Sequence, residues 1–118
     1  MSNDTKKLRA ALYARFSTEK QSESSIDDQL RVCERIAERE EFAVVAKFSD
    51  AAISGGTAER PGYQRMLEAA RQHEFDVIIA EDSSRLWREL SEQWRAVKEL
   101  LTLKVHVIGQ GGARHPSR

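Results

Sequence analysis

The sequence lacks the features that define several whole classes of protein. Its 118 residues include one cysteine, Cys33, so an internal disulfide cannot form, and no Cys/His cluster has zinc-site spacing. Two prolines and six glycines exclude a collagen-like or proline-rich chain. No apolar run approaches the ~20 residues that span a bilayer, and no apolar signal core follows Met1. We therefore expect a cytosolic protein that does not enter a membrane.

The charges of the chain cancel. Nineteen Lys and Arg residues stand against nineteen Asp and Glu residues, so no global basic field attracts nucleic acid, although a local basic site is compatible with this balance. Hydrophobic residues make up 40%, which can fill a modest core and excludes wholesale disorder. The length suits one domain.

Short apolar runs alternate with amphipathic segments along the chain. The runs predict four strands, at Leu8–Ala14, Phe42–Phe48, Val77–Ala80 and Val105–Ile108. Apolar residues at helical spacing predict three helices, from Ser25 to about Glu40, from Pro61 through Ala70, and along the stripe of Leu90, Trp94, Val97 and Leu101.

This alternation predicts an α/β protein with three layers, α/β/α, around a mostly parallel central sheet of four or five strands. We expect one folded domain over residues 8–109, an N-terminal tail at 1–7 and a disordered tail at 110–118. Cys33 and Trp94 fall on apolar helix stripes, so we expect Cys33 in the core and Trp94 in the core or in a subunit contact.

Arginine and serine side chains follow the carboxyl ends of the predicted strands, where ligands bind in parallel sheets. Arg15 and Ser17 follow the first strand, and Arg85 and Arg88 follow the third. Guanidinium groups bind phosphate bidentately, and a hydroxyl beside a phosphorus held in this way could attack it. The pattern therefore favours phosphate chemistry.

Other chemistries fit the sequence less well. The three histidines lie at a helix end, inside a strand and in the tail, which disfavours a Ser-His-Asp hydrolase. No Walker-type phosphate loop is present. A receiver-like magnesium site built on Asp50, Glu81 or Asp82 remains an alternative, but the neighbouring arginines disfavour a cation.

Three blocks of residues, in order, resemble the serine recombinases, the family of resolvases, invertases and large serine integrases. The resemblance runs from about Leu8 to Gly109. Its blocks are Tyr13-Ala14-Arg15-Phe16-Ser17-Thr18 with Gln21 and then Ser25 to Leu30, Asp50 to Gly62 with Ser54-Gly55 and Glu59-Arg60-Pro61, and Ser84-Arg85-Leu86-Trp87-Arg88.

The resemblance implies the catalytic domain of a site-specific DNA recombinase, as found in mobile genetic elements that integrate or resolve DNA. It implies strand cleavage through a 5′-phosphoserine intermediate, without metal or cofactor. The partners that it implies are DNA and further copies of the chain, as dimers and, in the active assembly, tetramers.

The resemblance also assigns roles to individual residues. Ser17 matches the nucleophile, and Arg15, Arg60, Arg85 and Arg88 match active-site arginines that would hold the phosphate. The supporting polar positions are Gln21, Gln29, Asp50 and Ser54.

Two departures from the family pattern stand out. Many resolvases have Asp immediately before the first arginine of the third block, where this chain has Ser84. The long helix and DNA-binding region that normally follow are absent from these 118 residues, so we expect the isolated fragment to be inactive. The alternative interpretation is a non-catalytic remnant or an assembly module of a recombinase.

Overall fold

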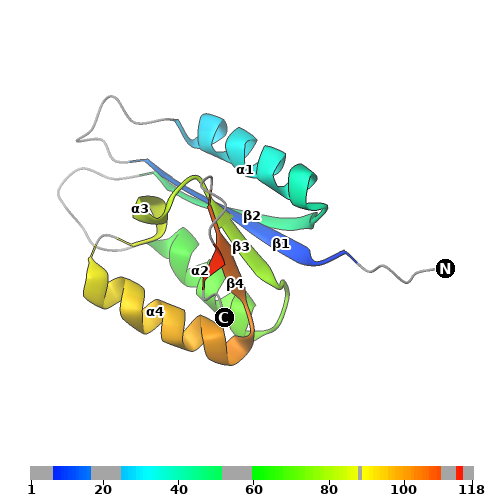
Figure 1. Cartoon of the computed structure of the whole chain (residues 1–118). Helices are drawn as coiled ribbons and strands as arrows, with labels where there is room; N and C mark the ends of the chain where they lie inside the picture. Colours follow the sequence, from blue (N-terminus) through cyan, green and yellow to red (C-terminus); the bar gives the residue numbers. More distant parts are fainter. Residues whose placement is uncertain (1–6, 17–24, 52–59, 88, 110–113, 116–118) are drawn as a thin grey trace.

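A twisted five-stranded sheet forms the centre of the protein. In the computed structural model, the strands lie in the order β2-β1-β3-β4-β5 (Figure 1). The structure describes residues 7–16, 25–51, 60–87, 89–109 and 114–115. The strands are β1 (Arg9–Phe16), β2 (Ala43–Ala51), β3 (Val77–Ala80), β4 (His106–Ile108) and β5 (Arg114–His115). Strands β1 to β4 are parallel to their neighbours, and β5 is antiparallel to β4.

Helices cover both faces of this sheet. They are α1 (Ile26–Glu40), α2 (Pro61–Arg71), α3 (Ser83–Leu86) and α4 (Leu90–Leu103). Helix α1 lies on one face, and α2 and α4 lie on the other (Figure 1). The predicted three-layer α/β/α architecture is therefore confirmed. None of the helices in the described ranges is long and apolar enough to cross a membrane.

Local sequence signals set the ends of α1 and α2. The Ser25 hydroxyl accepts a hydrogen bond from the Asp28 N–H at 3.1 Å, as expected for a helix N-cap, and two aspartates occupy the first turn near the positive end of the helix dipole. Helix α1 ends at Glu40, and the C-cap residue Glu41 has a φ of 63°, in the left-handed region. Pro61 opens α2, where its missing N–H costs nothing.

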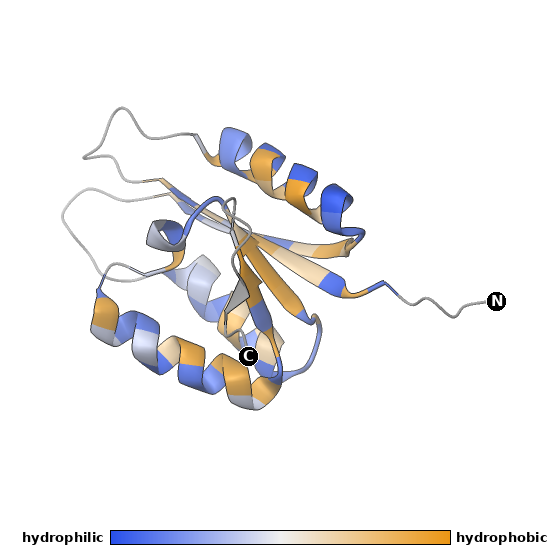
Figure 2. Ribbon diagram, in the orientation of Figure 1, coloured by the Kyte–Doolittle hydropathy of each residue, from blue (hydrophilic) through white to orange (hydrophobic). Residues whose placement is uncertain are grey.

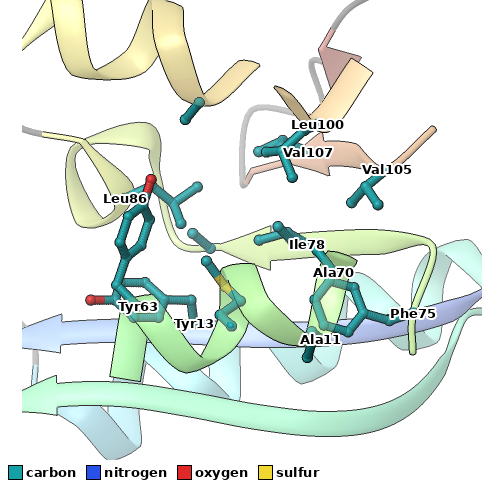
Figure 3. Close-up of a cluster of buried hydrophobic side chains, with 14 of the residues drawn as sticks. Ala11, Tyr13, Tyr63, Ala70, Phe75, Ile78, Leu86, Leu100, Val105 and Val107 are labelled. Carbon is teal, nitrogen blue, oxygen red and sulfur yellow. The ribbon is translucent and has the colours of Figure 1, made fainter. Parts of the chain in front are cut away.

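The sheet separates two hydrophobic clusters. The larger cluster packs α2, α3 and α4 against the sheet, and Figure 3 shows Tyr13, Tyr63 and Leu86 together at one end of it. The smaller cluster packs α1 against the other face and contains Cys33, as predicted. Burial raises the pKa of the Cys33 thiol to about 12, which disfavours the reactive thiolate form.

The apolar side chains expected along α4 are mostly exposed. Leu90, Trp94 and Leu101 are 81%, 67% and 47% exposed, whereas Ala96 and Leu100 form the buried face. Helical spacing identifies apolar faces, but it does not say which of two faces meets the sheet. For Trp94, only the subunit-contact half of the prediction is compatible with this exposure.

The predicted disorder of residues 110–118 is wrong for two of them. Arg114 and His115 form β5 and pair with Ile108 and Val107 of β4. An edge strand presents unpaired backbone groups, and β5 covers those of β4. The other tail residues, and residues 1–6 of the predicted N-terminal tail, lie outside the described residues.

Candidate active site

Five of the nine predicted site residues lie in the described part of the chain. They are Arg15, Gln29, Asp50, Arg60 and Arg85. The other four, Ser17, Gln21, Ser54 and Arg88, lie outside it. All five described residues come together at the carboxyl ends of β1, β2 and β3, the edge that the sequence predicted for the site.

Strand β1 extends two residues further than predicted and includes Arg15. Gln29 of α1 holds this end of the strand with its amide group. Its Oε1 accepts from the Arg15 N–H at 3.0 Å, and its Nε2 donates to the Arg15 carbonyl at 2.8 Å. The fully buried Gln29 thus replaces a neighbouring strand and fixes the backbone two residues before Ser17.

The Arg15 side chain contacts the backbone of α3. Its Nη2 donates to the carbonyl of Ser84 at 2.8 Å, and its Nε donates to the carbonyl of Arg85 at 3.2 Å. These carbonyls belong to the short turn that carries Arg85. The first and third blocks of the sequence therefore meet directly, although about seventy residues separate them.

Arg60 also donates hydrogen bonds to the backbone of the α3 turn. Its Nη2 donates to the carbonyls of Arg85 at 3.2 Å and of Leu86 at 2.6 Å. The guanidinium is buried, and its Nη1 pairs with the Glu92 carboxylate of α4 at 3.1 Å. It also lies over the Tyr63 ring, 4.2 Å from the ring centroid. The ion pair, the aromatic ring and the carbonyl acceptors together offset the free-energy cost of removing this charge from water.

Asp50 ties β2 to α2 and to β1. Its carboxylate accepts the N–H groups of Gly62 at 2.7 Å and Tyr63 at 2.8 Å, and the Tyr13 hydroxyl at 2.7 Å. Arg60, the N-cap residue of α2, supplies no side-chain cap, so Asp50 satisfies the first turn from a strand. This approach needs Gly62, because a Cβ there would stand 2.2 Å from the Ser49 carbonyl oxygen.

Tyr13 links Asp50 to Arg60. Its hydroxyl donates to Asp50 and accepts from Arg60 Nη2 at 3.2 Å. Burial raises the pKa of Tyr13 well above its ordinary value, and the positive charge of Arg60 opposes this shift without cancelling it. Tyr13 therefore stays a neutral hydroxyl that donates and accepts at once. Burial also raises the pKa of Tyr63, whose hydroxyl accepts from Trp87 Nε1 at 3.0 Å.

Arg85 is buried and paired within its own turn. Its guanidinium contacts the Glu81 carboxylate, with Nη2 3.1 Å and Nε 3.2 Å from Oε1. Helix α3 ends at Leu86, and the backbone of Trp87 is extended. Trp87 itself is buried.

The carboxylates of the magnesium alternative already have protein partners. Glu81 pairs with Arg85, Asp50 caps α2, and Asp82 caps α3 by accepting the Ser84 N–H and hydroxyl. Within the described ranges, no group of three or more His, Cys, Asp or Glu side chains is placed to hold a metal ion.

Sequence reasoning missed several members of this network. Tyr13 enters the sequence analysis only as a motif residue. Tyr63 and Glu92 are not identified there, because the spacing of α4 does not say which side chain meets Arg60. The polar end of Tyr13 was the one available hint, since a buried tyrosine hydroxyl usually finds a hydrogen-bond partner.

A comparison with protein families identifies the family of this chain. The model for "Resolvase, N terminal domain" matches residues 10–113. A putative DNA recombinase of Bacillus subtilis (strain 168) is 35% identical over 104 residues. The match covers 86% of this chain and 20% of that protein, so the chain spans about a fifth of its relative's length.

Solved structures agree with the family match. The N-terminal catalytic domain of TP901-1 integrase has a TM-score of 0.78 at 29% identity, over 92% of this chain and 82% of that one. A resolvase family site-specific recombinase from Streptococcus pneumoniae has a TM-score of 0.81 over 95% of this chain and 78% of that one. At 19% identity, the second likeness shows the fold alone.

Proposed function

Because this chain belongs to the resolvase family of serine recombinases, we propose that it is the catalytic domain of a site-specific DNA recombinase, with Ser17 as the nucleophile. The observation that carries the proposal is the convergence of Arg15, Arg60 and Arg85 on the α3 turn, beside the strand end that leads into Ser17. These three arginines come from distant parts of the sequence and meet at one turn, next to the strand end that leads into Ser17.

The proposed reaction is a transfer of the DNA phosphodiester to Ser17. The hydroxyl attacks the phosphorus and loses its proton, and the 3′ oxygen of the broken strand leaves and gains one. The 5′ phosphate is then held as a phosphoserine ester, which keeps the phosphodiester energy for religation to a new 3′ hydroxyl. Arginine charges would stabilise the negative charge that builds up on the non-bridging oxygens.

The arginines divide into two roles in this proposal. Arg15, Arg85 and Arg88 would face the phosphate, with the Glu81 carboxylate giving way to it at Arg85. Arg60 acts as a positioning residue, because its buried guanidinium donates to Tyr13, to Glu92 and to two backbone carbonyls of the α3 segment. Gln29 and Asp50 position the ends of β1 and α2, and Gln21 and Ser54 are proposed as polar supports of the same site.

The test is covalent trapping of DNA by the recombinase that carries this domain, on its own recombination site. The expected wild-type product is an adduct that survives denaturant and leaves a free 3′ hydroxyl, which a polymerase can extend. Ser17→Ala should abolish the adduct. Ser91→Ala, which removes an exposed hydroxyl of α4, is the matched control and should retain it. An adduct that survives Ser17→Ala would remove Ser17 from the reaction.

A second candidate function is an assembly module without catalysis of its own. The observation in its favour is the exposed apolar side of α4, which is suited to contact with another protein. This candidate predicts no DNA adduct with the wild-type serine in place. The same trapping experiment therefore separates the two functions.

A further inference from the structure

Two ion pairs join α4 to α2, and one of them belongs to the candidate site. Glu92, in the first turn of α4, pairs with Arg60 at the start of α2, and Glu99 pairs with Arg71 at the end of α2. The two glutamates are seven residues, about two helical turns, apart and so project from the same side of α4. Figure 2 shows α4 as a mixture of hydrophilic and hydrophobic positions. One helix therefore carries two comparable carboxylates, of which Glu92 contacts a site residue.

The two ion pairs differ in the burial of their arginines. The Arg71 side chain is 43% exposed, so water can hydrate its charge whether or not Glu99 is present. The Arg60 side chain is 10% exposed, so its charge needs a partner within the protein. Glu92 Oε2 lies 3.1 Å from Arg60 Nη1. Loss of the Glu92 carboxylate therefore removes the counter-charge of a buried cation, whereas loss of Glu99 leaves a hydrated one.

The other nitrogens of Arg60 hold the α3 segment and Tyr13. Nη2 donates to the carbonyls of Arg85 and Leu86 and to the Tyr13 hydroxyl, and Nε donates to the same hydroxyl at 3.4 Å. A guanidinium is rigid and planar, so a carboxylate that holds Nη1 also fixes the direction of the N–H groups on Nη2. Glu92 therefore acts through Arg60 on the backbone of Arg85, whose side chain would face the phosphate in the proposed function.

The Glu92 carboxylate also determines what the charge of Arg60 acts on. A carboxylate beside a guanidinium is a charged acceptor that neutralises the positive charge at close range. Without it, the Arg60 charge would be attracted to a DNA phosphate bound nearby. A guanidinium that turns toward the phosphate no longer donates to the α3 carbonyls. Binding of DNA would then be kept, while the alignment of the site would be lost.

We propose that Glu92 is a positioning residue of the active site, which holds Arg60 on the α3 segment and keeps the Arg60 charge from the DNA phosphate. This inference rests on the proposed function and adds to it a residue outside the three blocks that carry the family resemblance. Glu92 does not contact the reacting atoms in this proposal. Its effect is on the geometry of the α3 segment and of the Arg85 side chain that this segment carries.

The rate of covalent adduct formation tests the proposal, in the recombinase that carries this domain and on its own recombination site. Glu92→Ala should slow single-turnover adduct formation at saturating protein by roughly tenfold to a hundredfold, because misplacement by about 1 Å costs up to about a hundredfold. Glu92→Gln keeps an acceptor oxygen without the charge and should lie between Glu92→Ala and the wild type. Glu99→Ala removes the other carboxylate of the same helix side and is the matched control, whose rate should stay within about twofold of the wild type.

The affinity for DNA separates a positioning role from a general loss of structure. In a Ser17→Ala background, where cleavage should not proceed, adding Glu92→Ala should leave binding to the recombination site at least as tight as before. A merely structural role would weaken binding together with the rate. A wild-type rate for Glu92→Ala, an equal loss for Glu99→Ala, or an affinity that falls in parallel with the rate would overturn the proposal.

A second measurement needs neither DNA nor catalysis. In the 118-residue chain, NMR can follow exchange of the Arg60 Nε–H with water, which is slow while the guanidinium stays buried and hydrogen-bonded. Glu92→Ala should speed this exchange by about tenfold or more, and Glu99→Ala should leave it unchanged. Unchanged exchange in Glu92→Ala would overturn the proposal. If the wild-type recombinase forms no adduct, the Ser17 chemistry fails, whereas this exchange still decides whether Glu92 holds Arg60.

Discussion

Replacing Asp50 by alanine should destabilise the fold more than any exposed carboxylate replacement. The carboxylate accepts three hydrogen bonds, two from the first turn of α2 and one from Tyr13. Removing the carboxylate takes this buried acceptor away from the N–H groups of Gly62 and Tyr63 and from the Tyr13 hydroxyl. An unsatisfied buried donor costs about 1–3 kcal/mol, and loss of an N-cap costs about 0.5–2 kcal/mol.

These terms are not additive, because water can enter the vacated space and Tyr13 keeps its contact with Arg60. We expect Asp50→Ala to lower the free energy of unfolding by about 3–5 kcal/mol, a large share of the 5–15 kcal/mol of a typical domain. Asp50→Asn keeps one acceptor oxygen, and its loss should lie between those of the wild type and Asp50→Ala.

Urea unfolding, followed by far-UV circular dichroism and by tryptophan fluorescence, measures this loss. The control is Glu34→Ala, which removes an exposed carboxylate paired with Lys47 and should cost less than about 0.5 kcal/mol. A loss below about 1 kcal/mol for Asp50→Ala, with an unchanged dependence on urea, would refute the idea that Asp50 anchors α2 to the sheet.

Four further predictions follow from named contacts. Tyr13→Phe removes the hydroxyl that bridges Asp50 and Arg60 and should cost about 1.5–3 kcal/mol in urea unfolding; a neutral result would contradict the bridge. Gly62→Ala places a Cβ 2.2 Å from the Ser49 carbonyl oxygen, so its melting temperature should fall well below that of Gly109→Ala, whose Cβ would stand 3.6 Å from its nearest neighbour; equal melting would refute the close approach. Native Cys33 should react with an aromatic disulfide reagent at pH 8 more than about a thousandfold more slowly than in urea, and fast native labelling would contradict its burial. A hydrogen bond from the Arg9 side chain holds the pKa of Asp76 below its ordinary value, so the Asp76 contribution to stability is complete above about pH 4, the unfolded pKa, and is lost as the pH falls through the lower folded pKa. The difference in unfolding free energy between wild type and Asp76→Asn should therefore shrink from pH 6 to pH 3. A difference that widens would contradict the direction of the pKa shift.

Local signals in the sequence predicted most of the secondary structure. Helix α1 lies within the predicted range that starts at Ser25, Pro61 opens α2, and Val77–Ala80 is a strand, all as predicted. Each of these features depends on residues close together in the chain. The errors arose where distant residues decide, as at β5, which forms only because β4 offers it an edge.

The candidate site was predicted by residue type and by position at the sheet edge, but its internal contacts were not. Arg60 illustrates the difference. The family pattern identified this residue, whereas its burial against Tyr63, Glu92 and the carbonyl of Leu86 depends on how α2, α3 and α4 pack. A pattern of residues along the chain does not specify such contacts.

The sequence by itself determined the alternation of strands and helices, the edge of the sheet that gathers the arginines, and the family. These properties follow from periodicity and from motif order, which are local or ordered along the chain. Only the tertiary structure decided that Arg60 and Asp50 hold the site together from inside, and that the apolar stripe of α4 faces solvent. Both outcomes depend on which faces meet when the helices pack on the sheet, and that choice is made by the whole fold at once.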